Sequence, residues 1–219
     1  MPLQLYYDNL SPPSRVVRIL VKEIGLDVEE KQVNLMAGDH MKPEFLAINP
    51  FHCVPTLVDD GYALWESRSI ITYLVDKFAP GHSLYPTDLQ KRATVNRWLH
   101  WDSGTFYASL NAYYVPLFYG KPYQPASLES FKKAATALDD SLKNTKYVAG
   151  DELSVADIPI TVTLTLATAI GIDTGELKNV EKWLKQVETD LKPSTWKTLV
   201  IDPANALRDL LKAISSKSS

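Results

Sequence analysis

Two short stretches of the sequence carry polar groups at a spacing that suits the binding of a small acidic peptide. The first is Val54-Pro55-Thr56, in which a proline opens an apolar run that ends at an Asp-Asp-Gly turn. A sheet tolerates proline at the first residue of a strand. The peptide bond before Pro55 can be cis, because the cis form of an X–Pro bond costs only about 0.5–1 kcal/mol. The N–H and C=O of Val54 would then point outward, where they could pair with an extended peptide.

The second stretch is Glu66-Ser67, at the expected start of a helix. A serine hydroxyl and the free backbone N–H groups of a helix N-terminus suit a carboxylate. Together the two stretches are predicted to form a clamp around a small acidic peptide.

A serine pair, Ser11-Pro12-Pro13-Ser14, occupies the expected loop between the first strand and the first helix. A thioredoxin-like redox protein carries two cysteines at this place, and without a thiol no dithiol exchange can start there. A serine hydroxyl can instead donate to an incoming anion, helped by the positive end of the helix that begins near Pro13. The alternative is that Ser11 only caps that helix.

The order of the expected elements near the amino end is that of a thioredoxin-like domain. A strand, a helix that Gly25 ends, and a second strand give a βαβ unit with parallel strands and a right-handed crossover; a short helical turn, a hairpin and a helix follow. The ranges are 3–7, 16–24, 28–33, 43–46, 56–58 with 62–64, and 67–78. We expect a mixed four-stranded sheet, βαβ followed by ββα, within a domain spanning residues 1–80.

The remaining chain is predicted to be helical. Residues 81–87 form a linker rich in helix breakers, and no strand-like alternation recurs in the domain at 88–219. Helices are expected over 88–119, 128–142 and 158–170, the last of them buried on nearly every face. Before it, Ser154 is predicted to cap the helix and Asp157 to reach back to the Ser154 N–H, each worth about 0.5–2 kcal/mol.

Three motifs carry a resemblance to a known family. Asn-Pro-x-His-x-Val-Pro-Thr-Leu at 49–57 is preceded by Asp-His-Met-Lys-Pro-Glu-Phe at 39–45 and followed by Leu-Trp-Glu-Ser-Arg-x-Ile at 64–70. The set resembles a cytosolic glutathione S-transferase of the arthropod delta or epsilon type. The resemblance implies that glutathione is a co-substrate whose thiolate attacks hydrophobic electrophiles in detoxification, that no cofactor is needed, and that peroxidase or dehydrochlorinase side activities are open.

The same resemblance assigns site residues. Ser11 would donate a hydrogen bond to the thiolate, although Ser14 departs from the cysteine expected there. The other glutathione contacts would come from His40 and His52 at the glycine end, the backbone of Val54 beside Pro55 at the cysteinyl group, and Glu66, Ser67 and Arg68 at the γ-glutamyl end. Cys53 lies among them, but neighbours on an extended segment point to opposite sides, so a catalytic pair with His52 is not expected.

Aromatic side chains mark two stripes on the long helix. The residues of one stripe are spaced to share a helix face: Tyr107, Asn111, Tyr114 and Phe118. This stripe either belongs to the core or forms one wall of a hydrophobic substrate site. The family resemblance implies that Leu207 lies near such a site. The other, Phe106 and Tyr113, is rotated by about 100°. We expect it at the two-fold axis of a homodimer, the alternative being that Phe106 packs inside its own subunit.

Composition excludes several classes of protein. Lys plus Arg total 23 against 26 Asp plus Glu, without a run of like charges, which argues against binding nucleic acid. One cysteine and no amino-terminal apolar run predict a cytoplasmic protein without disulfide, signal peptide or membrane span. The four histidines show no metal-ligand spacing. Two rival functions are a non-catalytic ligand binder of the same fold and a thiol-dependent reductase, which would need cysteine in place of Ser11.

Overall fold

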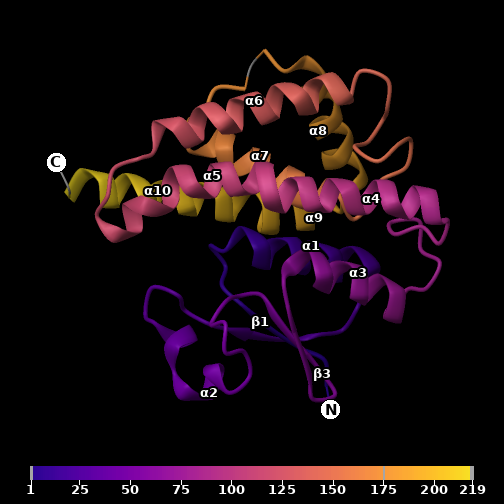
Figure 1. The fold of residues 1–219 in the computed structure, drawn as a ribbon. Helices are drawn as coiled ribbons and strands as arrows, with labels where there is room; N and C mark the ends of the chain where they lie inside the picture. The colour runs from indigo at the N-terminus through magenta and orange to yellow at the C-terminus, as the bar shows by residue number, and fades with distance from the viewer. Residues whose placement is uncertain (1, 175, 218–219) are drawn as a thin grey trace. The chain divides into compact units, whose positions relative to one another are not determined.

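The computed structural model describes residues 2–174 and 176–217. The chain forms two compact units, Met1–His82 and Ser83–Ser219, and the division falls inside the predicted linker. All the strands of the described residues belong to the first unit, and the second is built from helices (Figure 1).

The first unit has the predicted order of strands and helices. β1 pairs with β2 in parallel and with β3 antiparallel, and β3 pairs with β4 antiparallel, which gives a four-stranded mixed sheet in the order β2-β1-β3-β4. The elements are β1 (Gln4–Tyr7), α1 (Pro12–Ile24), β2 (Glu29–Gln32), the 3₁₀ turn η1 (Asp39–Met41), α2 (Pro43–Leu46), β3 (Thr56–Asp59), β4 (Tyr62–Trp65) and α3 (Ser67–Phe78). The predicted thioredoxin-like arrangement is confirmed.

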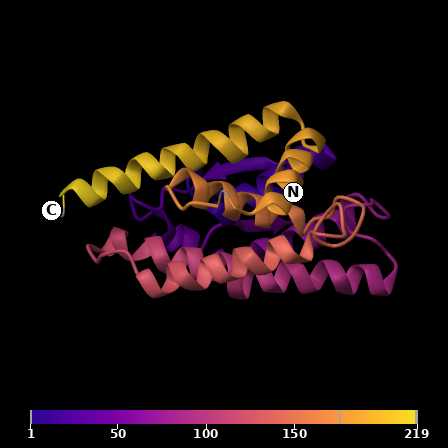
Figure 2. The ribbon, with the colours of Figure 1, turned by 90° about the horizontal axis from the view of Figure 1, so that it is seen from above.

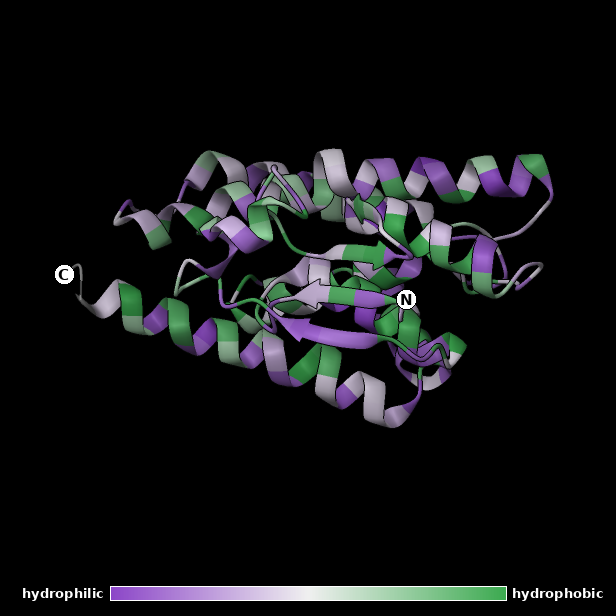
Figure 3. Ribbon diagram, turned by 90° about the horizontal axis from the view of Figure 1, so that it is seen from below, coloured by the Kyte–Doolittle hydropathy of each residue, from purple (hydrophilic) through white to green (hydrophobic). Residues whose placement is uncertain are grey.

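Local residue chemistry explains where these elements begin and end. α1 opens with Pro12 and Pro13, which suit a first helical turn, and it ends at Gly25, whose φ of 69° favours glycine. The charged strand β2 forms one edge of the sheet and is hydrophilic along its whole length (Figure 3). A charged edge strand discourages pairing with other chains.

The core of this unit lies on both faces of the sheet. α1 and α3 pack together on one side, and α2 lies on the other (Figure 1). Leu5 and Leu57, which are neighbours across β1 and β3, are fully buried. On the α2 side a second cluster joins Val33, Phe45 and Val54. The sheet is therefore covered on both faces, which fixes the loops at its ends.

The regular elements described in the second unit are helices, joined by turns and loops. Its elements are α4 (Leu89–Trp101), the π-helical segment η2 (Asp102–Phe106), α5 (Tyr107–Tyr114), the 3₁₀ turn η3 (Val115–Tyr119), α6 (Pro125–Ser141), α7 (Asp157–Ala169), α8 (Lys178–Asp190), α9 (Pro193–Thr195), the π-helical segment η4 (Trp196–Ile201) and α10 (Asp202–Lys217). Figure 2 shows α10 along one side of this unit and α4 to α6 along the other. The buried helix α7 contacts both α5 and α10, so it forms the predicted centre.

The predicted long helix has the expected ends but not a uniform geometry. Asp88 caps it by accepting hydrogen bonds from the N–H groups of Gln90 (3.1 Å) and Lys91 (2.9 Å), and Gly120 ends it with a φ of 66°. Between these ends the α-helix is interrupted by η2 and finishes in η3. Residue spacings that assume an α-helix therefore hold only inside α4 and α5.

The capping prediction before α7 is half right. The carboxylate of Asp157 accepts from the Ser154 N–H at 2.9 Å, as predicted. However, α7 begins at Asp157, and the Ser154 hydroxyl accepts only from the Ala156 N–H at 3.3 Å, ahead of the helix. Ser154 as the helix cap is therefore wrong, because its hydroxyl instead donates to Asp157 at 2.9 Å.

Candidate active site

The sheet register brings the predicted site segments to one end of the first unit. Tyr6 pairs with Thr56, Thr56 pairs with Trp65, and Tyr7 pairs with Gln32. The segments that continue from these residues are the Ser11 loop after β1, residues 33–42 after β2, residues 52–55 before β3, and Glu66-Ser67 after β4. The candidate residues are thus gathered from four places in the chain by strand pairing alone.

Ser11 stands at the N-cap of α1. Its side chain is 9% exposed, and its Oγ accepts a hydrogen bond from the Ser14 N–H at 3.3 Å. The capping role is therefore present, but a hydroxyl that accepts can still donate its proton. Capping and donation to an anion are compatible at Ser11.

Ser14 plays a different part from Ser11. Its side chain is fully buried, and its Oγ accepts from the Asp8 N–H at 3.4 Å. Ser14 is thus tied to the end of β1 inside the protein.

Asp8 is a residue that the sequence reasoning missed. Its carboxylate accepts from the Leu10 N–H at 2.7 Å and from the Leu35 N–H at 3.0 Å. An Asp that bonds to the backbone two residues on is a common turn device, and this signal was present in the sequence. The contact with Leu35 spans 27 residues and was not visible there.

The turn before β3 is built around Asn49, which is also absent from the predicted set. Asn49 is fully buried, and its amide donates to the Thr56 Oγ1 at 2.9 Å and to the Cys53 carbonyl at 3.2 Å. The Val54–Pro55 bond is cis. Within residues 2–174 and 176–217, neither the N–H nor the C=O of Val54 takes part in a hydrogen bond. This strand mouth therefore offers a free donor and a free acceptor.

The start of α3 offers a second set of donors. Glu66 has a φ of 70°, which is rare for a residue other than glycine and is typically found at ligand sites. No side chain of the described residues caps α3. Ser67 is buried, and its Oγ accepts from Arg68 Nη1 at 2.7 Å, which leaves its proton available. This helix terminus can accept a carboxylate.

His40 and His52 lie close together, with ring centroids 6.2 Å apart. The Nδ1 atom of His40 is buried and has no hydrogen-bond partner among the described residues. Cys53 is a free, half-buried thiol whose Sγ lies 3.4 Å from the Asn49 amide nitrogen. In the part of the chain that the structure describes, no three His, Cys, Asp or Glu side chains form a group that could hold a metal ion.

The predicted hydrophobic stripe in the second unit is partly exposed. Tyr107 and Asn111 are half-buried, whereas Tyr114 and Leu207 are buried. Phe118 lies in the 3₁₀ turn η3, outside the α-helical spacing that the prediction assumed. Its ring still packs edge-on against Tyr114, with the ring centroids 6.5 Å apart. The accessible surface of the stripe therefore comes from Tyr107, Asn111 and Phe118.

Phe106 does not offer the contact surface that was predicted for it. Its side chain has no exposed area. Its ring stacks on Phe131 and on Trp101, with ring centroids 4.7 Å and 5.1 Å apart. The prediction that it meets its own copy in a dimer is wrong, because α6 already covers it. Tyr113 remains partly exposed and stacks on Tyr123 at 4.7 Å.

A membrane span is not among the elements: within the described ranges, no helix is long and apolar enough to cross a bilayer.

Known proteins resemble this chain along almost its whole length. Two family models match it, "Glutathione S-transferase, N-terminal domain" over residues 1–76 and "Glutathione S-transferase, C-terminal domain" over residues 104–190. The chain is 42% identical over 185 residues to Glutathione S-transferase D7 of Drosophila melanogaster, covering 84% of this chain and 83% of that protein.

Solved structures of insect proteins share the fold. A delta-class glutathione transferase of Nilaparvata lugens is 37% identical with a TM-score of 0.91, covering 97% of this chain and 100% of that chain. An epsilon-class glutathione S-transferase of the housefly Musca domestica is 34% identical with a TM-score of 0.88, covering 97% and 98%.

Proposed function

This chain belongs to the glutathione S-transferase family and is a glutathione transferase, and we propose that Ser11 activates glutathione bound at the end of the sheet in the first unit. Glutathione brings the thiol, and its thiolate attacks an electrophilic carbon of a hydrophobic compound. The protein then contributes ionisation, orientation and proximity.

The observation that carries this proposal is the set of unengaged polar groups at that end of the sheet. The N-terminus of α3, with Glu66 and Ser67, suits the ammonium and carboxylate of the γ-glutamyl end. The free N–H and C=O of Val54 suit the backbone of the cysteinyl residue. We assign His40 and His52 to the glycine carboxylate, Arg68 to the γ-glutamyl end, and Pro55, beside Val54, to the cysteinyl group.

Ser11 can supply the required stabilisation of the thiolate. Lowering a thiol pKa from about 8.5 to about 6.5 corresponds to roughly 2.7 kcal/mol. A charge-assisted hydrogen bond from the Ser11 hydroxyl and the positive end of α1 together reach this size. Cys53 has no part in this step.

We propose that the partly exposed stripe in the second unit binds the hydrophobic electrophile. Tyr107, Asn111 and Phe118 expose apolar surface with one amide among it, as is typical of small-molecule sites. Tyr114 and Leu207, which are buried, would pack behind these three residues.

We also propose that the protein is a cytoplasmic homodimer. A free Cys53 suits a reducing compartment. With Phe106 buried, the contact moves to another aromatic: Phe51 is 61% exposed and stacks against Trp65 at 5.0 Å. Covering the exposed ring of Phe51 with a second copy of the chain would remove apolar surface from water and so favour association.

Light scattering after size exclusion tests the dimer, with an expected mass of twice 24.5 kDa. Phe51→Ala should weaken it, whereas Tyr62→Ala, which removes another exposed aromatic, should not. A monomeric wild type would overturn the proposal. If Phe51→Ala dimerises as tightly as the wild type, Phe51 does not lie in the dimer interface.

Conjugation of glutathione to a chloronitrobenzene tests the proposed role of Ser11. Ser11→Ala should lower turnover by about one to three orders of magnitude, the size seen on removing one oriented donor, and Ser14→Ala should matter much less. Retention on glutathione-agarose without turnover by the wild type would favour the non-catalytic binder. Equal losses in the two serine variants would reject Ser11 as the donor.

A further inference from the structure

One buried carboxylate joins the Ser11 loop to the segment that carries His40. Asp8, at the end of β1, is 8% exposed. Its Oδ1 accepts from the Leu10 N–H at 2.7 Å, and its backbone C=O accepts from the Ser11 N–H at 3.2 Å. Its other oxygen, Oδ2, accepts from the Leu35 N–H at 3.0 Å. The two oxygens of Asp8 thus hold two different parts of the candidate site.

The His40 segment, residues 34–42, is shaped mainly by bonds within itself. Asp39 Oδ2 accepts from the Asn34 N–H at 3.0 Å, Asn34 Oδ1 accepts from the Ala37 N–H at 3.0 Å, and Lys42 pairs with Asp39 at 2.6 Å. These bonds fix the form of the segment but not its place relative to Ser11. That link comes from the Leu35–Asp8 hydrogen bond and, just before it on each chain segment, from the Val33 N–H, which donates to the Tyr7 C=O at 2.7 Å.

We propose that Asp8 is a positioning residue for glutathione conjugation, setting the Ser11 hydroxyl and the His40 segment at a fixed separation. This inference rests on the proposed function, in which Ser11 serves the thiolate and His40 the glycine end of glutathione. Because the bound peptide spans both ends, the distance between them decides whether its thiol reaches Ser11 when its carboxylate is held. A loose His40 segment therefore weakens glutathione binding, whereas a displacement of about 1 Å at the Ser11 hydroxyl itself can cost about a hundredfold in rate.

The chemistry of a carboxylate explains why aspartate suits this position. Both oxygens accept, and neither donates, so two N–H groups from separate segments can be held at once. Asparagine has one accepting oxygen, and its amide would keep the Leu10 bond of the local turn while turning an NH₂ group toward the Leu35 N–H. Asp8→Asn therefore removes the side-chain link to the His40 segment and leaves only the Val33–Tyr7 backbone bond, and Asp8→Ala removes both side-chain bonds of Asp8.

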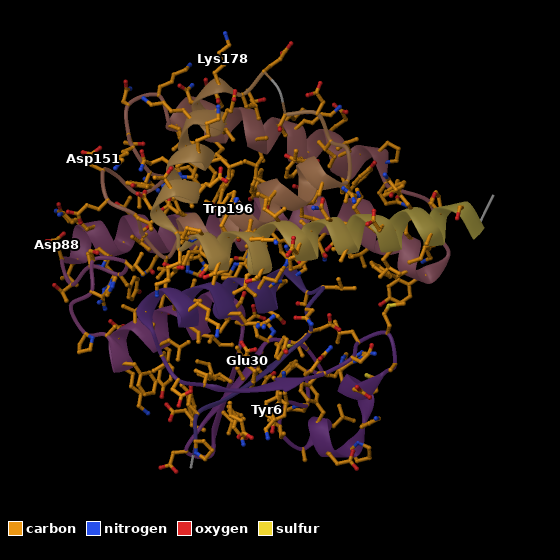
Figure 4. The ribbon with its side chains drawn as sticks, turned by 180° about the vertical axis from the view of Figure 1, so that it is seen from behind. Tyr6, Glu30, Asp88, Asp151, Lys178 and Trp196 are labelled. Carbon is orange, nitrogen blue, oxygen red and sulfur yellow. The ribbon has the colours of Figure 1, made fainter. Side chains whose placement is uncertain are left out.

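The neighbouring residue provides a matched control. Asn9 Oδ1 accepts from Arg18 Nη1 at 2.7 Å, and Arg18 also pairs with Glu30 on β2 at 2.9 Å (Glu30 is labelled in Figure 4). Asn9→Ala thus removes one hydrogen bond from the same loop, but it leaves the link to the His40 segment intact.

Steady-state conjugation kinetics with glutathione as the varied substrate test the proposal, together with the pH profile of kcat. Asp8→Asn should raise the glutathione KM about fivefold, the size of one hydrogen bond, with the kcat profile unchanged. Asp8→Ala should raise KM similarly, lower kcat about tenfold or more, and shift the kcat profile to higher pH, since the Ser11 loop loosens as well. Asn9→Ala should leave KM and the profile at wild-type values.

Two reference variants separate this inference from the proposed function. Ser11→Ala should lower kcat, and His40→Ala should raise the glutathione KM; if neither does so, the proposed site itself is wrong. If both behave as expected while Asp8→Asn keeps the wild-type KM, the positioning role is rejected. A loss of thermal midpoint in Asp8→Asn without a change in KM shows a purely structural role and rejects it too. Should Asp8→Ala fail to fold, the comparison of Asp8→Asn with Asn9→Ala still decides the matter.

Discussion

Removing the carboxylate of Asp157 should destabilise the protein far more than removing the neighbouring Ser154 hydroxyl. Asp157 is fully buried at the start of α7. Its Oδ1 accepts from the Val148 N–H at 3.0 Å and from Trp183 Nε1 at 2.9 Å, and its Oδ2 accepts from the N–H and the hydroxyl of Ser154, each at 2.9 Å. Burial raises the pKa of Asp157, against these hydrogen bonds, which lower it. One side chain thus joins a loop, α7 and α8.

The magnitude follows from the donors left behind. Asp157→Ala strands the Val148 N–H, the Ser154 N–H and the buried Trp183 Nε1, each worth about 1–3 kcal/mol. The gain from no longer burying a carboxylate offsets part of this sum, so a loss of about 3–5 kcal/mol is expected, as for other broken buried charge networks. Ser154→Ala removes one donor and one weak acceptor and should cost about 1 kcal/mol.

Urea unfolding followed by circular dichroism measures both losses. Asp157→Asn is the matched control, because its remaining oxygen still serves Val148 and Trp183, so its loss should fall between the other two. If the losses of unfolding free energy in Asp157→Ala and Ser154→Ala differ by less than about 1 kcal/mol, the hydrogen bonds of Asp157 do not contribute the stability assigned to them.

Three further changes test other parts of the structure. Asn49→Ala should cost about 2–3 kcal/mol in urea unfolding, since its amide loses a buried hydrogen bond to Thr56 Oγ1 and a partly buried one to the Cys53 carbonyl. A loss below about 1 kcal/mol would contradict the turn described. Desolvation raises the pKa of Asp59, but hydrogen bonds from Lys77 (2.5 Å) and Tyr73 (2.6 Å) lower it below its ordinary 3.8 overall. Its stabilisation is therefore complete above 3.8 and lost as the pH falls through the folded value, so Asp59→Asn should flatten the acid limb of the stability curve, and an unchanged limb would count against the network. Ser67→Ala should raise the glutathione KM more than it lowers kcat, because its contact is far from the sulfur; calorimetry that finds unchanged glutathione affinity would reject the assigned pose.

The first unit could be predicted from sequence because its signals are local. Pro12-Pro13 and Gly25 bound α1, and the hairpin turns at Asp60 and Gly61, where φ is 49° and 85°. The backbone conformation that each of these residues favours follows from its own side chain. The strand ends, in turn, fix where the site segments meet.

The interruptions of the long helix could not be predicted in this way. Asp102, at the start of η2, is fully buried and accepts from Thr163 Oγ1 of α7 at 3.3 Å, and Phe106, at its end, stacks on α6. These partners lie far along the chain, so the residue spacing of the helix alone does not reveal them. The error over Phe106 has the same origin, since the stripe was assigned without the cover that α6 provides.

The residues missed at the site share a similar feature. Asp8 and Asn49 are buried polar side chains whose partners include backbone groups of loops. Sequence motifs identify side chains that touch a ligand more readily than those that hold the loops around it. Their roles emerged only when the loops were placed by the sheet.

The ionisation of the bound thiol tests the central claim most directly. The ultraviolet absorbance of the glutathione thiolate, titrated with pH in the complex, gives the pKa of the bound thiol without any catalytic step. In the wild type this pKa should lie about two units below that of a free thiol, and in Ser11→Ala it should return close to the free value, with Ser14→Ala resembling the wild type. A bound thiol in Ser11→Ala that ionises as readily as in the wild type would contradict the assignment of Ser11.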